Sequence, residues 1–461
     1  MIKEFSSLRD PAGYIFYDDG RVYRSISKTY QDDYDFLNNS GLYKHLVELN
    51  YLISHEESDY MISNDEHYKI IEPIKIDFIS YSYEWSFSQF KEAALLTLQI
   101  QLESSNYGMT LKDATPYNVQ FVKSRPIFID TLSFEKIKNE DFSWSPLKQF
   151  NELFLGPLIL MSKVDISANS YLKTSINGIP INKTLDLLKF KNKFNPFIFF
   201  NLIVPNFISS SNRSSKNEPY KSLKISKTQH QNIINSYIDF IESLNINNLK
   251  TEWGKYNQET EDEKNDYVIN KEKILIDFLE ELKPKFVWDV GANDGYYSRI
   301  ICNTIDSNAK VFSLDIDPVC VENNFLINKK NKLNLSPLLF DIANPSPSIG
   351  WLNQERRNIF SRLPDSQLIV GLALIHHIIS LNIRIGEIIK FFAKTQKFSI
   401  IEYIPINDIK CQQIFKSRID QIEYPDESEF QKETEKYFKI IKVEKLNPTD
   451  RKLYLLKKNE I

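Results

Sequence analysis

The sequence predicts a doubly wound α/β sheet over residues 266–461, preceded by an α+β domain over residues 1–208. Three observations support this division. After Phe286, short apolar segments alternate with helix-like segments, which is typical of βαβ units. The apolar segments lack strict alternation of polar and apolar residues, which indicates strands buried on both faces. Residues 208–222 are serine-rich and polar without apolar periodicity, as expected of a linker.

The composition is that of an ordinary globular protein. The 461 residues allow two or three domains of ~100–200 residues each, and 42% are hydrophobic and 26% charged. A net charge of −4 gives no electrostatic reason to expect a nucleic-acid partner. The three cysteines (Cys302, Cys320 and Cys411) lie far apart, so they predict thiols in a reducing compartment and no metal site.

The N-terminal stretch has charges where the apolar core of a signal peptide would lie, so we expect a cytoplasmic protein. The most apolar run, residues 194–207, is shorter than the ~20 residues that span a membrane. Pro196 and Pro205 also interrupt it. We therefore expect no transmembrane segment, and interpret this run as a buried helix or a docking surface.

The first domain is predicted to begin with a hairpin over residues 11–27, which contains Gly13 and Gly20. Residues 79–87 are interpreted as a connection between two lobes. Residues 209–265 are predicted to hold the linker and bridging helices. Helices are expected around 226–246 and 268–282, and the first carries an apolar stripe at helical spacing. We interpret both as helices that cover the next domain.

Seven strands are predicted in the second domain. A helix does not fit between the last two, which only residues 447–450 separate, so these two should form an antiparallel hairpin at the sheet edge. The predicted strands are 286–290, 310–315, 335–341, 367–374, 398–404, 438–446 and 451–458.

A glycine loop follows the first of these strands. In an open α/β sheet, ligands lie beyond the carboxyl ends of the strands, near the first strand–helix turn. Gly291 and Gly295 permit a tight turn and a close approach of backbone to ligand. A dinucleotide fingerprint would place glycine where Asn293 stands, and the observed pattern from Asp289 is D-x-G-x-x-x-G. The loop therefore favours a ligand without phosphates at this point.

Acidic residues end successive predicted strands. Asp315, with Asp317 close behind, follows the second strand, and Asp341, followed by Ile342, ends the third. A carboxylate at the end of the second strand can accept hydrogen bonds from both ribose hydroxyls of a nucleoside. Asp341, the acid at the end of the third strand, would meet the adenine amino group. S-adenosylmethionine is a ligand that meets these requirements.

The sequence resembles the class I S-adenosylmethionine-dependent methyltransferases over about residues 266–461. The matching positions belong to the glycine loop and to two strand ends: Asp289, Gly291, Gly295, Asp315 and Asp341. The stretches DIANPSPSIGW, LALIHHI, IIEYIP and DRKLYLL are also similar to a bacterial family of two-domain, nodulation-type methyltransferases. This resemblance implies methyl transfer and a Rossmann-like seven-stranded sheet, and it specifies no acceptor.

Candidate catalytic groups stand after the fourth and fifth strands, which would face the methyl group. His376, His377 and Glu402 are there. A histidine suits a general base, and a nearby carboxylate can orient it. The alternatives are that His377 packs or caps a helix and that Glu402 holds a substrate amine or hydroxyl. The stretch NPSP, residues 344–347, is similar to the Asn-Pro-Pro-Tyr motif of enzymes that methylate amines of bases or glutamine. That motif follows the fourth strand, whereas NPSP follows the third, so we interpret it as a rigid turn. The sequence therefore disfavours methylation of nucleic acid.

The first domain contains a second informative stretch, residues 111–134. Asp113, Asn118 and Asp130 there resemble the catalytic loop of kinase-like phosphotransferases, which implies ATP and magnesium at this domain. Leu111 and Lys112 replace the usual histidine before the base, and no glycine-rich loop is present. No lysine stands out as the one that binds phosphate in kinases. Arg24 is the candidate for this role, because we expect it on a comparable strand.

The sequence thus predicts methyl transfer from S-adenosylmethionine to a hydroxyl or amine of a small molecule, glycan or lipid-linked intermediate. An alternative is a bifunctional enzyme that phosphorylates and then methylates a glycan or metabolite. A third hypothesis is a non-catalytic module that binds the cofactor and transfers nothing.

Overall fold

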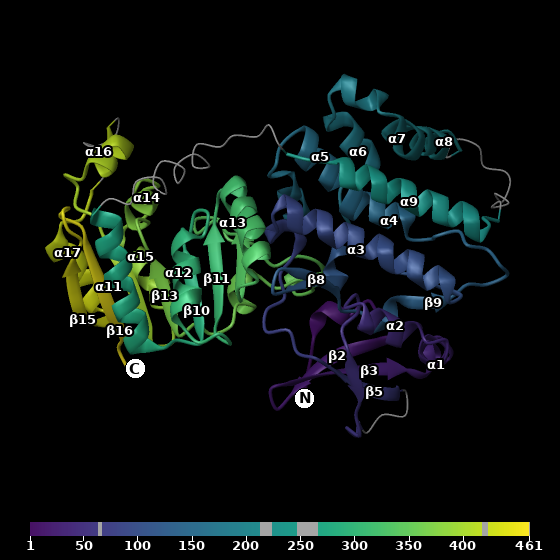
Figure 1. Ribbon diagram of the computed structural model, residues 1–461, viewed down its shortest axis with the longest axis horizontal. Coiled ribbons are helices and arrows are strands. Elements are labelled where there is room, and N and C mark those ends of the chain that lie inside the picture. Colours follow the sequence, from purple (N-terminus) through teal and green to yellow (C-terminus); the bar gives the residue numbers. More distant parts are fainter. Residues whose placement is uncertain (63–66, 213–223, 247–265, 417–422, 461) are drawn as a thin grey trace. The chain divides into compact units, whose positions relative to one another are not determined.

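The computed structural model describes residues 1–62, 67–212, 224–246, 266–416 and 423–460 (Figure 1). The chain divides into two compact units. The first comprises Met1–Leu249 and Ser346–Arg362, and the second Lys250–Pro345 and Leu363–Ile461. We call Ser346–Arg362 the arm, because it leaves the second unit's sequence to pack in the first. Most of the predicted linker lies outside the described residues.

The first unit begins with an antiparallel sheet in the order β1-β2-β3-β5-β4. The predicted hairpin is confirmed as β2 and β3, in which Asp18 pairs with Arg21. Asp19 and Gly20 form the turn, with φ of 47° and 72°. Two residues of positive φ match the right-handed twist of the flanking strands. The strands are β1 Ile2–Lys3, β2 Gly13–Asp18, β3 Arg21–Ser27, β4 His55–Glu57 and β5 His67–Pro73.

The remainder of the first unit surrounds the long helix α3, Phe87–Asn106. Ser86 and Gln89 form a capping box at its start, which satisfies two of the backbone amides that a helix leaves unpaired. Two short antiparallel pairs follow: the hairpin of β7 with β8, and β6 with β9, which lie before and after it in the chain. Their bounds are β6 Met109–Leu111, β7 Val119–Val122, β8 Arg125–Phe128 and β9 Phe134–Lys136. The helices are α1 Gln31–Asn39, α2 Leu42–Glu48, α4 Leu147–Phe150, α5 Gly156–Lys163, α6 Ile181–Leu187, α7 Pro196–Ile198, α8 Val204–Asn212 and α9 Lys227–Ser243.

Helix α9 corrects one prediction, that the helix around 226–246 covers the second domain. It belongs to the first unit and packs along α3. Gln101 and His230 form a hydrogen bond of 3.1 Å between the two helices, and Lys91 donates to the carbonyl of Leu244 at 2.8 Å. An apolar stripe establishes that one helix face is buried, but it does not specify which neighbour buries it.

The second unit is a seven-stranded sheet in the order β12-β11-β10-β13-β14-β16-β15. The neighbouring strands β12, β11, β10, β13 and β14 run parallel to one another. β16 is antiparallel to both β14 and β15. The predicted terminal hairpin is therefore confirmed. The strands are β10 Phe286–Val290, β11 Lys310–Asp315, β12 Leu335–Leu339, β13 Leu368–Gly371, β14 Phe398–Tyr403, β15 Phe438–Lys445 and β16 Lys452–Lys458.

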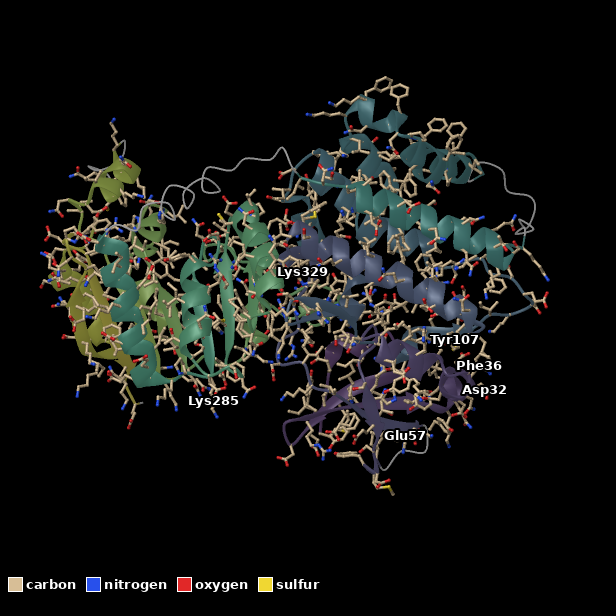
Figure 2. All side chains as sticks on the ribbon, in the orientation of Figure 1. Asp32, Phe36, Glu57, Tyr107, Lys285 and Lys329 are labelled. Carbon is tan, nitrogen blue, oxygen red and sulfur yellow. The ribbon has the colours of Figure 1, made fainter. Side chains whose placement is uncertain are left out.

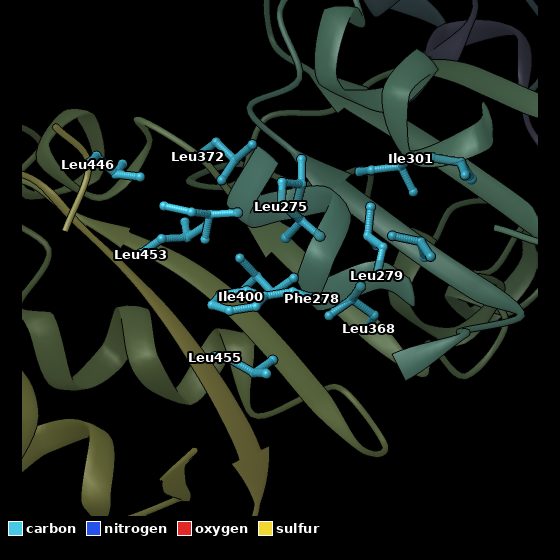
Figure 3. Close-up of a cluster of buried hydrophobic side chains, with 14 of the residues drawn as sticks. Leu275, Phe278, Leu279, Ile301, Leu368, Leu372, Ile400, Leu446, Leu453 and Leu455 are labelled. Carbon is cyan, nitrogen blue, oxygen red and sulfur yellow. The ribbon is translucent and has the colours of Figure 1, made fainter. Parts of the chain in front are cut away.

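Helices cover both faces of this sheet. Leu275 and Phe278 of α11 join a buried cluster that includes Leu453 of β16 (Figure 3). On the other face, Phe430 of α17 packs against Tyr454 with ring centroids 4.9 Å apart. This arrangement explains the continuous apolar runs of the central strands. The helices are α11 Asp266–Leu282, α12 Tyr296–Thr304, α13 Pro318–Asn331, α14 Ile375–Ile379, α15 Ile385–Phe392, α16 Ile409–Phe415 and α17 Glu427–Glu435.

Candidate functional site

The predicted cofactor residues lie at the carboxyl ends of parallel strands in the second unit's sheet. β10, β11 and β12 are parallel neighbours, so their carboxyl ends meet there. Val290 pairs with Leu314, and Asp315 pairs with Leu339. The end of β11 is therefore level with the glycine loop after β10.

The loop from Gly291 to Gly295 uses its own backbone amides internally. Gly291 and Ala292 donate to the carbonyl of Leu314 at 2.9 and 3.2 Å, and Gly295 donates to that of Ala292 at 2.9 Å. The amides of Asn293 and Asp294 donate to side chains, at 2.6 and 2.7 Å. A phosphate bound here would need such amides as donors. The donor pattern therefore fits a ligand that carries no phosphate at this position.

Asp289 is a structural residue of this loop and lies away from solvent. It is 2% exposed, and its carboxylate accepts a hydrogen bond from Ser298 of α12. The hydroxyls of Ser298 and Ser313 of β11 also share a hydrogen bond of 2.8 Å, in which Ser298 accepts, and this ties α12 to the sheet. Burial raises the pKa of Asp289 to about 6. Nearby, a Cβ atom on Gly295 (φ 80°) would lie 2.2 Å from the side chain of Asn324, so only glycine fits.

Asp315 is the acid that the loop orients. Its two carboxylate oxygens accept hydrogen bonds from the backbone amides of Asn293, at 2.6 Å, and Asp317, at 2.8 Å. Burial raises the pKa of Asp315 to about 6. Each carboxylate oxygen has a second lone pair, so Asp315 retains capacity to accept two hydroxyl groups. The next residue, Ile316, is apolar and 61% exposed at this same edge.

The other two predicted acids have local structural partners. Asp317 caps α13, accepting from the amides of Val319 at 2.8 Å and Cys320 at 3.3 Å. Asp341 accepts from the amides of Ala343 at 2.8 Å and Asn344 at 3.1 Å, which holds the turn after β12. Ile342 is half-buried within that turn.

Glu402 lies at the end of β14 in a fully buried polar network. One of its carboxylate oxygens accepts from the hydroxyl of Tyr267 at 2.6 Å, and the other accepts from Lys271 and from the amide of Ala373 at 2.9 Å. Burial acts to raise the pKa of Glu402, but the charges of Lys271 and Arg451 outweigh it and lower that pKa. Glu402 is thus ionised and occupied by protein groups.

The sequence prediction missed the partners of Glu402. Lys271 falls on the buried face of α11, between Val268 and Leu275, and is 2% exposed. A lysine among apolar residues at helical spacing signals a buried ion pair, because an unpaired buried ammonium is very costly. Arg451 joins the network from the β15–β16 turn, and its guanidinium also binds Asp408 through two hydrogen bonds of 2.8 and 2.9 Å.

His376 and His377 lie on α14, after β13. His376 is 3% exposed, and within the described part of the chain its Nδ1 has no hydrogen-bond partner. Burial and then the neighbouring His377 lower the pKa of His376 to about 3. Burial also lowers the pKa of His377, which is half-buried. Both rings are therefore neutral at pH 7, and His377 is the more accessible of the two.

The first unit brings Asp113, Asn118 and Asp130 together. Asn118 donates to Asp113 at 2.9 Å and to the hydroxyl of Ser133 at 3.1 Å, and Ser133 donates to Asp130 at 2.7 Å. Arg24 of β3 forms an ion pair with Asp130 at 2.6 Å. Burial, and then the charge of Asp130, raise the pKa of Asp113. A cation bound at Asp130 would have to compete with Arg24.

The comparisons with known proteins agree with the two-domain resemblance. No known family model matches the chain. Nodulation protein NoeA of Rhizobium meliloti (strain 1021) is 28% identical over 466 residues, which cover 98% of this chain and 96% of that protein. The expected similarity to a nodulation-type family is thereby confirmed along nearly the whole chain.

Solved methyltransferases are similar to part of the chain at low sequence identity. Magnesium protoporphyrin IX methyltransferase of Synechocystis PCC 6803, with bound SAH, is 12% identical, with a TM-score of 0.31 over 42% of this chain and 86% of its own. A putative O-methyltransferase of Nostoc punctiforme PCC 73102 is 14% identical, with a TM-score of 0.32 over 45% and 60%. The 16S rRNA methylase ArmA is 13% identical, with a TM-score of 0.30 over 46% and 100%.

Proposed function

We propose that the second unit binds S-adenosylmethionine and transfers its methyl group to a hydroxyl or amine acceptor. The observation that carries this proposal is the coupling of the glycine loop to Asp315 through the amide of Asn293. It fixes a carboxylate with remaining acceptor capacity beside a loop that has no amide to offer a phosphate. These are the requirements of a nucleoside linked to an amino acid rather than to a pyrophosphate.

In this proposal, Asp315 accepts the ribose hydroxyls, and Ile316 covers one face of the adenine. Asp341 and Ile342 border the adenine from the turn after β12. Gly291 gives the backbone close access to the ligand, with φ of 74°. When bound, S-adenosylmethionine supplies a methyl group on an electrophilic sulfonium, and the chain's own groups align and deprotonate the acceptor.

His377 is our preferred general base among the three candidates. It is neutral, so it can accept a proton, and it is more accessible than His376. We assign Glu402 a positioning role, because its carboxylate holds Lys271 and the amide of Ala373, the residue that follows β13 by two positions. His377→Ala should then lower kcat more than cofactor affinity, whereas Glu402→Gln should affect both.

Calorimetric titration with S-adenosylmethionine tests the cofactor proposal. Asp315→Ala should weaken binding by ~1.5–3 kcal/mol, the contribution of hydrogen bonds to a charged group. Replacement of the exposed Asp365 by alanine is the matched control and should leave affinity unchanged. Unchanged affinity in Asp315→Ala would contradict the ribose assignment.

Acceptor identity requires a separate assay with labelled S-adenosylmethionine. We propose small molecules, glycans and lipid-linked intermediates as the acceptor class, and nucleic acid serves as the comparison. Transfer to nucleic acid alone would contradict this class. Cofactor binding without transfer to any acceptor would instead support the non-catalytic module.

Phosphoryl transfer at the first unit is a second candidate function. The observation that favours it is that Asp113, Asn118 and Asp130 meet through Ser133, as a kinase-like loop requires. Titration with magnesium and ATP tests it, with Asp130→Ala as the inactivating variant. Binding that Arg24→Ala strengthens would indicate that Arg24 competes with magnesium. Absence of ATP binding in both the wild type and Arg24→Ala would exclude this function.

A further inference from the structure

One surface of the first unit exposes phenylalanine side chains. Phe190, Phe194 and Phe200 are 76%, 68% and 68% exposed, and Phe199 is 44% exposed. They lie within residues 190–203, which include α7 and the helical turns on either side of it. Figure 2 shows aromatic rings extending outward from the ribbon around α7 and α8. We call Phe190, Phe194, Phe199 and Phe200 the aromatic face.

The opposite side of the same segment is firmly packed. Ile198 and Leu202 are each 1% exposed. Phe197 stacks on Phe240 of α9, with ring centroids 4.1 Å apart and an interplanar angle of 7°. Phe197 also contacts Tyr237 edge to face, at 4.9 Å. The segment is therefore amphipathic, and its packed side fixes the direction in which the aromatic face points.

Lysines border the aromatic face. Lys189, Lys191 and Lys193 alternate with aromatic and polar residues immediately before α7, and no acidic residue occurs between positions 187 and 200. The whole chain carries a net charge of −4, so this local excess of three positive charges departs from the average surface. A cationic rim beside exposed aromatic side chains is the composition of a segment that lies in a membrane interface.

We propose that the aromatic face docks the protein on an anionic lipid bilayer. The phenylalanines would enter the boundary between headgroups and acyl chains, and the lysines would meet the lipid phosphates. Exposed phenylalanines alone would suit either a bilayer or a protein interface. The three lysines favour the bilayer, because lysine is depleted in protein interfaces. Within the described residues, no helix is both long and apolar enough to cross a membrane, so the proposed contact is peripheral. This inference is independent of the proposed methyl transfer.

Co-sedimentation of the full chain with vesicles tests the proposal. Binding to vesicles of phosphatidylcholine mixed with phosphatidylglycerol should exceed binding to phosphatidylcholine alone and should fall as salt increases. Replacing Lys189, Lys191 and Lys193 by glutamate should weaken binding by at least about 100-fold, since each lysine near an anionic surface contributes roughly fivefold. Phe190→Ser combined with Phe194→Ser should also abolish most of the binding.

Matched controls lie elsewhere on the described surface. Replacement of the exposed Lys283, Lys330 and Lys397 by glutamate makes the same change in charge, and Ile74→Ser, at a side chain 64% exposed, removes an apolar group from the same unit. Both controls should bind vesicles as the wild type does. All variants should keep their unfolding temperature and their affinity for S-adenosylmethionine.

Three results would overturn the proposal. The first is no binding to either vesicle, and the second is binding that the lysine and phenylalanine variants leave unchanged. The third is a self-association in solution that Phe190→Ser with Phe194→Ser abolishes while vesicle binding is absent. That last result would assign the aromatic face to a second copy of the chain.

Discussion

Asp315 links the loop geometry to a measurable pH dependence. Burial raises the pKa of its carboxyl to about 6, so the group is ionised at pH 7.5 and becomes protonated as the pH falls below 6. Hydrogen bonds to an ionised group contribute ~1.5–3 kcal/mol, against ~0.5–1.5 kcal/mol for neutral pairs. We therefore expect the affinity for S-adenosylmethionine to fall by up to about tenfold between about pH 7.5 and pH 5.

Calorimetry across this pH range measures the effect. Asp315→Asn is the control, because an amide does not titrate, and its lower affinity should vary little with pH. An equal pH dependence in wild type and Asp315→Asn would assign the titration to another group.

The ion pair of Lys271 with Glu402 should dominate the local stability of the second unit. Both side chains are almost completely buried, at 3% and 0% exposure. Removing Lys271 leaves the buried Glu402 with one remaining cation, Arg451, at 3.4 Å. Breaking a buried ion pair typically costs ~3–5 kcal/mol. Lys271→Met should therefore lower the urea unfolding midpoint strongly, and Glu402→Leu added to it should recover part of the loss.

The pair of Lys442 with Glu281 supplies the comparison. It has similar geometry, at 2.6 Å, but both side chains are about half exposed. Ion pairs in solvent are screened and contribute little, so Lys442→Met should hardly change the unfolding midpoint. If Lys271→Met cost no more than Lys442→Met, the network around Glu402 would not be a stabilising element.

The elements of the second unit could be predicted from sequence because each central strand is a continuous apolar run of limited length. β10 and β11 begin and end at the predicted residues, and the terminal hairpin follows from a connection too short for a helix. The loop glycines and Asp315 could also be predicted, since they depend on local chain geometry. Lys271 and Glu402 are 131 residues apart, so local patterns cannot pair them.

The neighbour of an amphipathic helix is likewise a long-range property. α9 has the apolar stripe that the sequence predicts, but Ile234 and Ile241 are buried in the first unit rather than against the second. The packing of the arm in the first unit was not predicted either. Its sequence has no periodicity that would indicate a helix or a strand. Its contacts with the rest of the first unit include ion pairs of Arg357 with Glu4 and of Arg362 with Glu84, which lie far away in the sequence.

The position of α9 gives a prediction at the level of elements. Ile234 is fully buried, and truncation of a buried isoleucine to alanine costs ~2–5 kcal/mol. Ile234→Ala should accelerate hydrogen exchange in peptides from α3, against which α9 packs. Peptides from β10 to β14 should be unaffected. Faster exchange in those strands, with α3 unchanged, would contradict the assignment of α9 to the first unit.

The arm lies between two strands of the second unit in the sequence, but it packs in the first unit. Glu84 of the first unit is fully buried. It forms an ion pair with Arg362, at the end of the arm. The same guanidinium lies 3.9 Å from the ring centroid of Tyr81 and donates to the carbonyl of Ile79. The first unit therefore depends on a residue encoded between β12 and β13 of the second.

This dependence predicts that a substitution late in the sequence destabilises the first unit. Arg362→Met removes the cation from a buried carboxylate and should cost ~3–5 kcal/mol. Hydrogen exchange in α3, which follows Glu84 directly, should rise accordingly. Arg357→Met is the control on the same arm, because Arg357 is half exposed in its pair with Glu4 and should contribute at most about 1 kcal/mol.

Glu84→Gln in the Arg362→Met background decides whether charge is the cause. A neutral amide needs no counter-ion, so this double variant should regain much of the lost protection in α3. The same reasoning predicts that Glu84→Gln stabilises a fragment of residues 1–249, which lacks the arm. If Arg362→Met matched Arg357→Met, the arm would not hold the first unit together, and the two units would be energetically separate.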